Sequence, residues 1–239
     1  MRPRAVVAWM AAILSLGLVL SGCGTPPPRL DQHSWKAYSD RFVTADGRVI
    51  DRDSGTPGIT HTEGLGYGML LAEAAEDRRG FELIWRWTRE HLRRPDGLFS
   101  WRYGPCPTRG GDCVLDKNNA SDGDILIAWA LLRAGKAWGR SDYVDAARAI
   151  AAAVADTQIV RVGGTTLLLP GSEGFVDGNA VVVNPSYWIF PAFSAFAQAF
   201  EAPVWSTLSD SSLALLRQSR FGRWNLPPDW LKVQGEQLS

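Results

Sequence analysis

The carboxylates at the start of one helical segment are the most informative feature of this 239-residue chain. Residues 120–138 read ASDGDILIAWALLRAGKAW, in which Asp122 and Asp124 precede apolar residues that recur at helical spacing. Ser121 followed by Asp124 also resembles a capping box, and acids are favoured at a helix N-terminus. Spacing alone therefore leaves two interpretations open, residues that only cap a helix or carboxylates that do chemistry.

A further carboxylate stands in a glycine-rich segment. Residues 61–69 read HTEGLGYGM, and the three glycines allow close approach of the backbone to other groups. We expect them to leave Glu63 on a loop immediately before a helix. A purely structural role is the alternative, because a helix dipole favours a glutamate at its N-terminus.

Helical periodicity dominates the chain that must position these groups. Besides the helix that follows Asp122, helices are expected over residues 66–78, 81–92, 143–155, 187–200 and 203–218. Pro191 is expected to bend or interrupt the fourth of these, and residues 158–169 indicate a small β-hairpin. The chain is therefore predicted to consist mainly of helical hairpins.

The spacing of three polar residues supports this arrangement. Glu63 lies 59 residues before Asp122, and Asp122 lies 62 residues before Asn184. In an array of two-helix units, each with an inner and an outer helix, a near-constant interval would place all three at the same end of successive inner helices.

The N-terminus has the pattern of an export signal. Arg2 and Arg4 precede an apolar run over residues 6–20, which is too short for a comfortable membrane span. Residues 1–22 are therefore interpreted as a lipoprotein signal peptide.

A lipid anchor is expected directly after this signal. Leu20 to Cys23 reads LSGC and resembles a bacterial lipobox, which implies acylation of Cys23; an ordinary signal peptide with a chance cysteine is the alternative. Prolines 26–28 predict a stiff tether over residues 23–34, with the folded domain at 35–239. We expect a periplasmic protein anchored to a bacterial membrane, the outer membrane in particular.

Composition argues against nucleic acid as a partner. The chain has 25 basic and 25 acidic residues; without residues 1–22, which hold two basic and no acidic ones, the balance is 23 − 25 = −2. This balance also offers no polybasic membrane patch. Eleven tryptophans suit a helical core, but they also suit a cleft in which sugar rings stack on aromatic faces.

With Cys23 assigned to lipid, Cys106 and Cys113 remain as an even pair that flanks a short loop. In an exported protein this pattern predicts a disulfide. A metal site is not expected, because the three histidines are scattered and none lies near the pair.

Taken together, these segments resemble glycoside hydrolase family 8. Residues 120–138 match the family signature, and residues 61–69 resemble its S/T-E-G-x-G-Y-G-M element. Residues 184–188 (NPSYW) and 225–230 (NLPPDW) resemble two further elements in the same order, so the resemblance runs from about 35 to 230. It implies an all-α fold, the (α/α)6 toroid of helical hairpins, whose substrate groove crosses one end of the inner helices.

The resemblance also implies catalytic roles. Glu63 corresponds to the proton donor, which must stay protonated near neutral pH, and burial or a nearby carboxylate such as Asp122 would raise its pKa accordingly. Asp122 is the signature's active-site residue, for which we favour stabilising the sugar ring or positioning water over a covalent role. Asp124 is expected only to cap the helix.

Further residues are implied as substrate-binding. Tyr187 matches the tyrosine beside the cleaved bond, and Asn184 begins the same element. Trp101 and Tyr103 stand where the family has a sugar-stacking loop, and Asp116 and Asn119 are expected to orient Asp122.

One departure concerns the C-terminus. The family continues beyond the L-P-P-D-W element into a Y-D-A-x-R-x-P segment that carries the general-base aspartate, and the 60-residue interval places the next inner helix near 245, beyond Ser239. The expectation is therefore a C-terminally truncated or diverged member without the closing hairpins.

The combined interpretation is an endo-1,4-β-glucanase that acts on cellulose-like glucan by an inverting acid/base mechanism, without metal or cofactor. The resemblance includes the periplasmic cellulase of cellulose-synthesis operons, so the synthesis machinery is a further expected partner. The alternatives are a non-catalytic glucan-binding lipoprotein of a polysaccharide secretion system and a related hydrolase of xylan or chitosan.

Overall fold

The computed structural model describes residues 29–52, 55, 58–108, 110–235 and 237–239. The expected signal peptide, Cys23 and the prolines of the tether lie outside these ranges. The helices are α1 (Gln32–Phe42), α2 (Thr62–Ala74), α3 (Arg78–Leu92), α4 (Ser121–Trp138), α5 (Ser141–Gln158), the 3₁₀ helix η1 (Pro185–Tyr187), α6 (Phe190–Phe200) and α7 (Pro203–Gln218). Across the described residues, no helix is both long and apolar enough to cross a bilayer.

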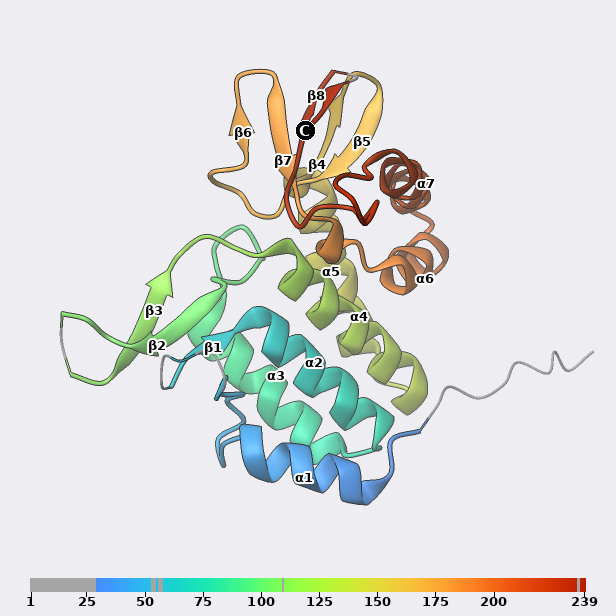
Figure 1. The fold of residues 1–239 in the computed structure, drawn as a ribbon. Coiled ribbons are helices and arrows are strands. Elements are labelled where there is room, and N and C mark those ends of the chain that lie inside the picture. Colours follow the sequence, from blue (N-terminus) through green and yellow to red (C-terminus); the bar gives the residue numbers. More distant parts are fainter. Residues whose placement is uncertain (1–28, 53–54, 56–57, 109, 236) are drawn as a thin grey trace, which may run out of the picture.

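Successive helices form antiparallel hairpins, as predicted (Figure 1). α2 pairs with α3, α4 with α5, and α6 with α7, while α4 packs between α2 and α6. α2, α4 and α6 therefore form the inner row and α3, α5 and α7 the outer row of a helical-hairpin barrel. α1 packs beside α2.

Sequence explains which helix of a pair is inner. α4 is buried around nearly its whole circumference, and small residues such as Ala128, Ala130 and Ala134 let its neighbours approach. It ends at Gly139, whose φ of 68° is the left-handed cap that a glycine adopts most easily. α3, in contrast, buries one stripe that includes Phe81, Ile84 and Trp85, as an outer helix must.

Short strands decorate the ends of the hairpins (Figure 1). They are β1 (Thr60–His61), β2 (Arg102–Pro105), β3 (Asp112–Asp116), β4 (Ile159–Val162), β5 (Thr165–Leu168), β6 (Val176–Asp177), β7 (Ala180–Val183), β8 (Leu231–Gln234) and β9 (Gln237–Leu238). β4 and β5 form the predicted hairpin, with Val162 opposite Thr165. The sheets β1-β2-β3 and β6-β7-β8-β9 were not foreseen, because their strands are two to five residues long and carry little alternation.

Three boundaries differ from the sequence expectation. α2 begins at Thr62 rather than near 66, because buried packing outweighs the low helix propensity of its glycines. Pro191 lies in the first turn of α6 and starts that helix instead of bending it. The folded part begins earlier than the expected residue 35: Asp31 caps α1 by accepting the backbone N–H of Ser34 at 2.9 Å.

Candidate active site

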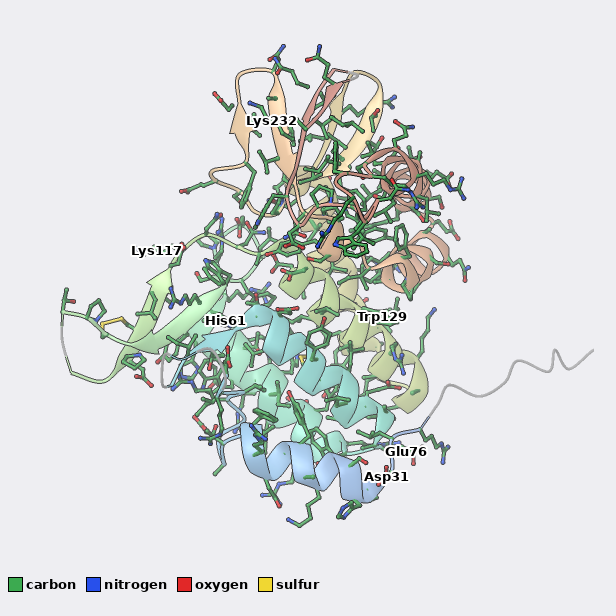
Figure 2. All side chains as sticks on the ribbon, in the orientation of Figure 1. Asp31, His61, Glu76, Lys117, Trp129 and Lys232 are labelled. Atoms are coloured by element: carbon green, nitrogen blue, oxygen red, sulfur yellow. A yellow bond between two sulfur atoms is a disulfide. The ribbon has the colours of Figure 1, made fainter. Side chains whose placement is uncertain are left out.

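Glu63 and Asp122 occupy equivalent positions on neighbouring inner helices. Each is the second residue of its helix, after Thr62 in α2 and after Ser121 in α4. The expectation that Glu63 lies on a loop is therefore wrong, and both carboxylates stand at the positive end of a helix dipole. Figure 2 shows His61 at this end of α2, whereas Glu76 marks the opposite end.

A glycine lets the two helix ends touch. A Cβ placed on Gly123 would lie 2.1 Å from Thr62 Oγ1, 2.5 Å from Thr62 Cβ and 2.9 Å from the backbone nitrogen of Glu63. One turn deeper, a Cβ on Gly66 would lie 2.5 Å from Leu126 Cβ. These two glycines form a seam along which α2 and α4 approach more closely than any side chain would permit, and this approach brings Glu63 beside Asp122.

The two carboxyl groups differ in how far they are buried. Asp122 is only 6% exposed, and its Oδ1 accepts the backbone N–H of Gly123 at 2.7 Å. This burial, helped by the charge of Glu63, raises the pKa of Asp122 to about 7. Glu63 is exposed. The sequence left burial or a nearby carboxylate as possible causes of a raised pKa at Glu63; the structure instead buries Asp122, because Asp122 belongs to the helix that is packed on every side.

Two tyrosines complete the group. Burial raises the pKa of Tyr67, and the charge of Glu63, a hydrogen bond with Glu63 and the charge of Asp122 add to the shift. Burial also raises the pKa of Tyr187, and the negative charges of Asp122 and Glu63 raise it further. Both phenols therefore lie beside the carboxylates. Tyr187 was foreseen, whereas Tyr67 was missed: it lies four residues after Glu63, so it shares a helix face with Glu63 once α2 is known to begin at Thr62.

A hollow of about 200 Å³ opens beside Glu63. Tyr38 and Phe42 of α1 line its apolar side, and Asp51, His61 and Glu63 line its polar side. His61 was not singled out by the sequence; burial lowers its pKa.

The expected sugar-stacking residues differ in their surroundings. Trp101 is partly exposed, stacks on His61 with ring centroids 5.3 Å apart, and donates a side-chain hydrogen bond to Asp116. Asp116 thus orients Trp101 rather than Asp122, and its hydrogen bonds lower its pKa. Tyr103 packs edge-on against Trp87 at 5.2 Å and under the Arg48 guanidinium at 5.0 Å. Its ring is engaged in the protein's own packing, so a stacking role for Tyr103 is not supported.

Asp124 and Asn119 form a buried pair behind the site. Asp124 is fully buried and accepts the backbone N–H of Phe99 at 3.0 Å and Asn119 Nδ2 at 2.9 Å. Burial raises the pKa of Asp124 to about 8, against the opposing effect of these hydrogen bonds. Ala120 holds the cap position of α4 without a side-chain bond, so the capping box with Ser121 is wrong. Asn119 contacts Asp124, and the expectation that it orients Asp122 is wrong as well.

Two other expected residues have structural surroundings. Asn184 caps η1, with Oδ1 accepting the backbone N–H of Ser186 at 2.9 Å and its hydroxyl at 2.6 Å. Cys106 and Cys113 are joined by a disulfide that ties β2 to β3, with Cα atoms 5.2 Å apart. Among the described residues, no three or more His, Cys, Asp or Glu side chains are grouped to hold a metal ion.

Comparison with known proteins bears on this arrangement of carboxylates. The family model described as "Glycosyl hydrolases family 8" matches residues 5–239. The chain is 44% identical over 206 residues to an endoglucanase of Cellulomonas uda, a match covering 86% of this chain and 56% of the relative. It is 40% identical over 224 residues to a probable endoglucanase of Novacetimonas hansenii, covering 90% and 63%.

Among solved structures, the family 8 endoglucanase of Klebsiella pneumoniae superposes with a TM-score of 0.82 at 43% identity, covering 87% of this chain and 66% of that one. The chain thus spans a little over half to two thirds of the length of these relatives. The family model, the identities and the shared helical-hairpin fold agree with the resemblance carried by the sequence elements, and the chain belongs to glycosyl hydrolase family 8.

Proposed function

We propose that this chain supplies the acid and the second carboxylate for cleaving internal β-1,4-glucosidic bonds of a cellulose-like glucan by acid/base hydrolysis, with the general base expected in the family's segment beyond residue 239. The observation that carries the proposal is the pairing of an exposed carboxyl, Glu63, with a buried one, Asp122, at the touching ends of α2 and α4. Two carboxyl groups in unlike surroundings are what glycoside hydrolysis requires, because one must give a proton while the other supports the developing charge.

Although in the free protein the raised pKa belongs to Asp122, reach toward the substrate supports the acid role of Glu63. Its carboxyl can reach the glycosidic oxygen of a chain lying across the helix ends, and that chain would in turn exclude water from it. The hydrogen bond with Tyr67 limits the directions in which the Glu63 carboxyl can point. Asp122 is more deeply buried, and in its ionised form it would stabilise positive charge on the ring or hold a water. The partly exposed Trp101 offers an aromatic face to a neighbouring sugar.

The burial of Asp122 favours catalysis over the non-catalytic alternative. A module that only binds glucan gains nothing from burying one carboxyl, Asp122, next to a second one, Glu63, whereas paired carboxyl groups with shifted pKa values are typical of reaction centres. Glucan is preferred to xylan or chitosan as the substrate because the relatives named above are endoglucanases.

The test compares three variants of the full chain. Glu63→Gln and Asp122→Asn should each lower the release of reducing ends from soluble β-glucan by about 10²–10⁴-fold, the usual contribution of a general acid or base. Binding of cello-oligosaccharide should persist, because both changes are nearly isosteric. Glu90→Gln on the exposed side of α3 is the matched control. Full activity in Glu63→Gln would remove the acid role, and binding without any cleavage by the wild type would favour the binding protein.

The location of this activity is a separate part of the proposal. The basic and apolar pattern of residues 1–22 and the LSGC sequence ending at Cys23 support export with a lipid anchor, on the periplasmic side of a bacterial membrane. Work alongside a cellulose-synthesis machinery is supported by the family resemblance alone.

A further inference from the structure

The first turn of α4 carries a buried polar network that the proposed chemistry does not use. Asp124 is its centre, fully buried and two residues after Asp122. Its Oδ1 accepts the backbone N–H of Phe99, and its Oδ2 accepts Asn119 Nδ2. Because its side chain is fully buried and both oxygens accept from protein donors, Asp124 does not contact a substrate.

Asn119 extends the network to a third segment. Its Oδ1 accepts the backbone N–H of Ser172 at 2.8 Å and the Ser172 hydroxyl at 2.7 Å. The orientation of the Asn119 amide is fixed by this arrangement, because the backbone N–H of Ser172 needs an acceptor and only the amide oxygen can supply one. Gly171 lies so close that a Cβ there would be 2.5 Å from the Asn119 carbonyl oxygen. Three chain segments, near 99, 119 and 172, are therefore joined through the Asp124–Asn119 pair.

These segments lead directly to Trp101, the aromatic side chain that is proposed to face the substrate. Trp101 follows Phe99 by two residues, and its backbone N–H donates to the carbonyl of Asn118 at 2.9 Å. The Trp101 carbonyl accepts the backbone N–H of Thr62 at 3.0 Å, so the position of Trp101 is coupled to the start of α2 as well. The Trp101 ring is oriented by Asp116, which also accepts the backbone N–H of Asn118.

We infer that Asp124 is a positioning residue that holds the sugar-stacking Trp101 at a fixed place relative to Asp122. This inference rests on the proposed function, because it assigns Trp101 to substrate binding. Asp124 does not contact Trp101 directly. It holds the backbone of Phe99 on one side and Asn119 on the other, next to Asn118, whose carbonyl accepts the backbone N–H of Trp101. A change at Asp124 should therefore weaken glucan binding more than it slows the chemical step.

Exchanging the side chains at positions 119 and 124 tests whether Asp124 acts through this hydrogen-bond network or is needed as a carboxylate for another reason. In Asp124→Asn, one amide cannot accept from both Phe99 and Asn119, so at least one buried donor loses its acceptor, whichever way Asn119 turns. In the double variant Asp124→Asn with Asn119→Asp, every partner is restored: the new aspartate accepts from Ser172 and from the new asparagine, whose oxygen accepts from Phe99. Asn119→Asp alone places a second carboxylate next to that of Asp124, where the two repel each other.

The experiment measures kcat and KM on soluble β-glucan, together with amide hydrogen exchange of residues 93–101 and 117–120, in wild type, both single variants and the double variant. Asp124→Asn should raise KM by up to about tenfold, because glucan binding must then reorder the Trp101 segment that the lost buried hydrogen bond no longer holds. We expect a smaller fall in kcat and faster exchange at Phe99 and Trp101. The double variant should return KM to within about twofold of wild type and restore slow exchange.

The outcomes distinguish the inference from the proposed function. If the wild type neither binds nor cleaves glucan, the proposed function fails, while the exchange rates still test whether Asp124 holds the Trp101 segment. If the wild type is active and Asp124→Asn keeps both its KM and its slow exchange, the inference is wrong. It is also overturned if the double variant folds but behaves like Asp124→Asn, because the carboxylate at 124 would then matter for a reason other than this network.

Discussion

Adding one methyl group at Gly123 should disturb catalysis more than folding. The new Cβ would stand 2.1 Å from Thr62 Oγ1, about 1.3 Å short of the 3.4 Å at which ordinary contacts begin. Thr62 is β-branched and buried, and turning its side chain would leave Thr62 Cβ only 2.5 Å from the new atom, so rotation does not relieve the clash. The helix ends must therefore separate by roughly an ångström, which moves Glu63 relative to Asp122.

The two expected magnitudes differ. Overpacking of this kind lowers the free energy of unfolding by about 1–3 kcal/mol. The higher helix propensity of alanine raises it by about 1 kcal/mol, so the net loss should be at most about 2 kcal/mol. A misplacement of about 1 Å between reacting groups, in contrast, can cost on the order of a hundredfold in rate. Gly123→Ala should thus remain folded while kcat on soluble β-glucan falls by roughly tenfold to a hundredfold.

Two further variants make the prediction specific. Thr62→Ser removes the methyl group and frees the hydroxyl to rotate, so adding it to Gly123→Ala should recover part of kcat. Gly66→Ala imposes a similar clash, 2.5 Å from Leu126 Cβ, one turn away from the carboxylates, and should cost stability with a smaller fall in kcat. Urea unfolding measures stability and reducing-end release measures kcat. The reasoning is refuted if Gly123→Ala keeps the wild-type kcat. It is also refuted if Gly66→Ala lowers kcat as much as Gly123→Ala does.

Three other predictions follow from the site and the sequence. Burial raises the pKa of Asp122 from 3.8 to about 7, so the folded state binds more protons than the unfolded state between these values, and stability should fall as the pH rises from about 4 to 7. Asp122→Asn should lessen this fall, by up to a few kcal/mol in order of magnitude; equal slopes of unfolding free energy against pH in both proteins would contradict the assigned shift. Alkylation of the unreduced protein followed by mass spectrometry should leave Cys106 and Cys113 unlabelled, and two labelled thiols would disprove the disulfide. In a lipoprotein-competent host, labelled palmitate should enter the wild type and be absent from Cys23→Ser; a wild type without label would indicate a protein that is not acylated.

Periodicity and short motifs were enough to predict the helical hairpins and the order of the site elements. α3, α5 and α7 have stripes or caps that local sequence specifies, and the glycine pair at 163–164 marks the turn of the β4–β5 hairpin. The sequence also singled out Glu63, Asp122 and Tyr187, because each stands in an element of the family and at the start of a helical unit.

The roles of the neighbours depended on contacts between distant segments. Tyr103 and Asn119 have the side chains of a sugar-binding site, but one ring is taken up by Trp87 and Arg48, and one amide by Asp124 and Ser172. Partners of this kind lie up to 55 residues away in the chain, where no periodic pattern links them.

The sequence by itself thus determined the helical class, the hairpin order and the two carboxylates, since these follow from spacing along a single chain. Only the tertiary structure decided which carboxyl is buried. Glu63 and Asp122 have the same local setting, a hydroxyl residue before and a glycine after, so no local pattern distinguishes them. They differ because α4 is enclosed between α2, α5 and α6, so that Asp122 is shielded from water while Glu63 remains exposed. Burial therefore raises the pKa of Asp122, a property of the packed helices rather than of either residue's neighbours in the chain.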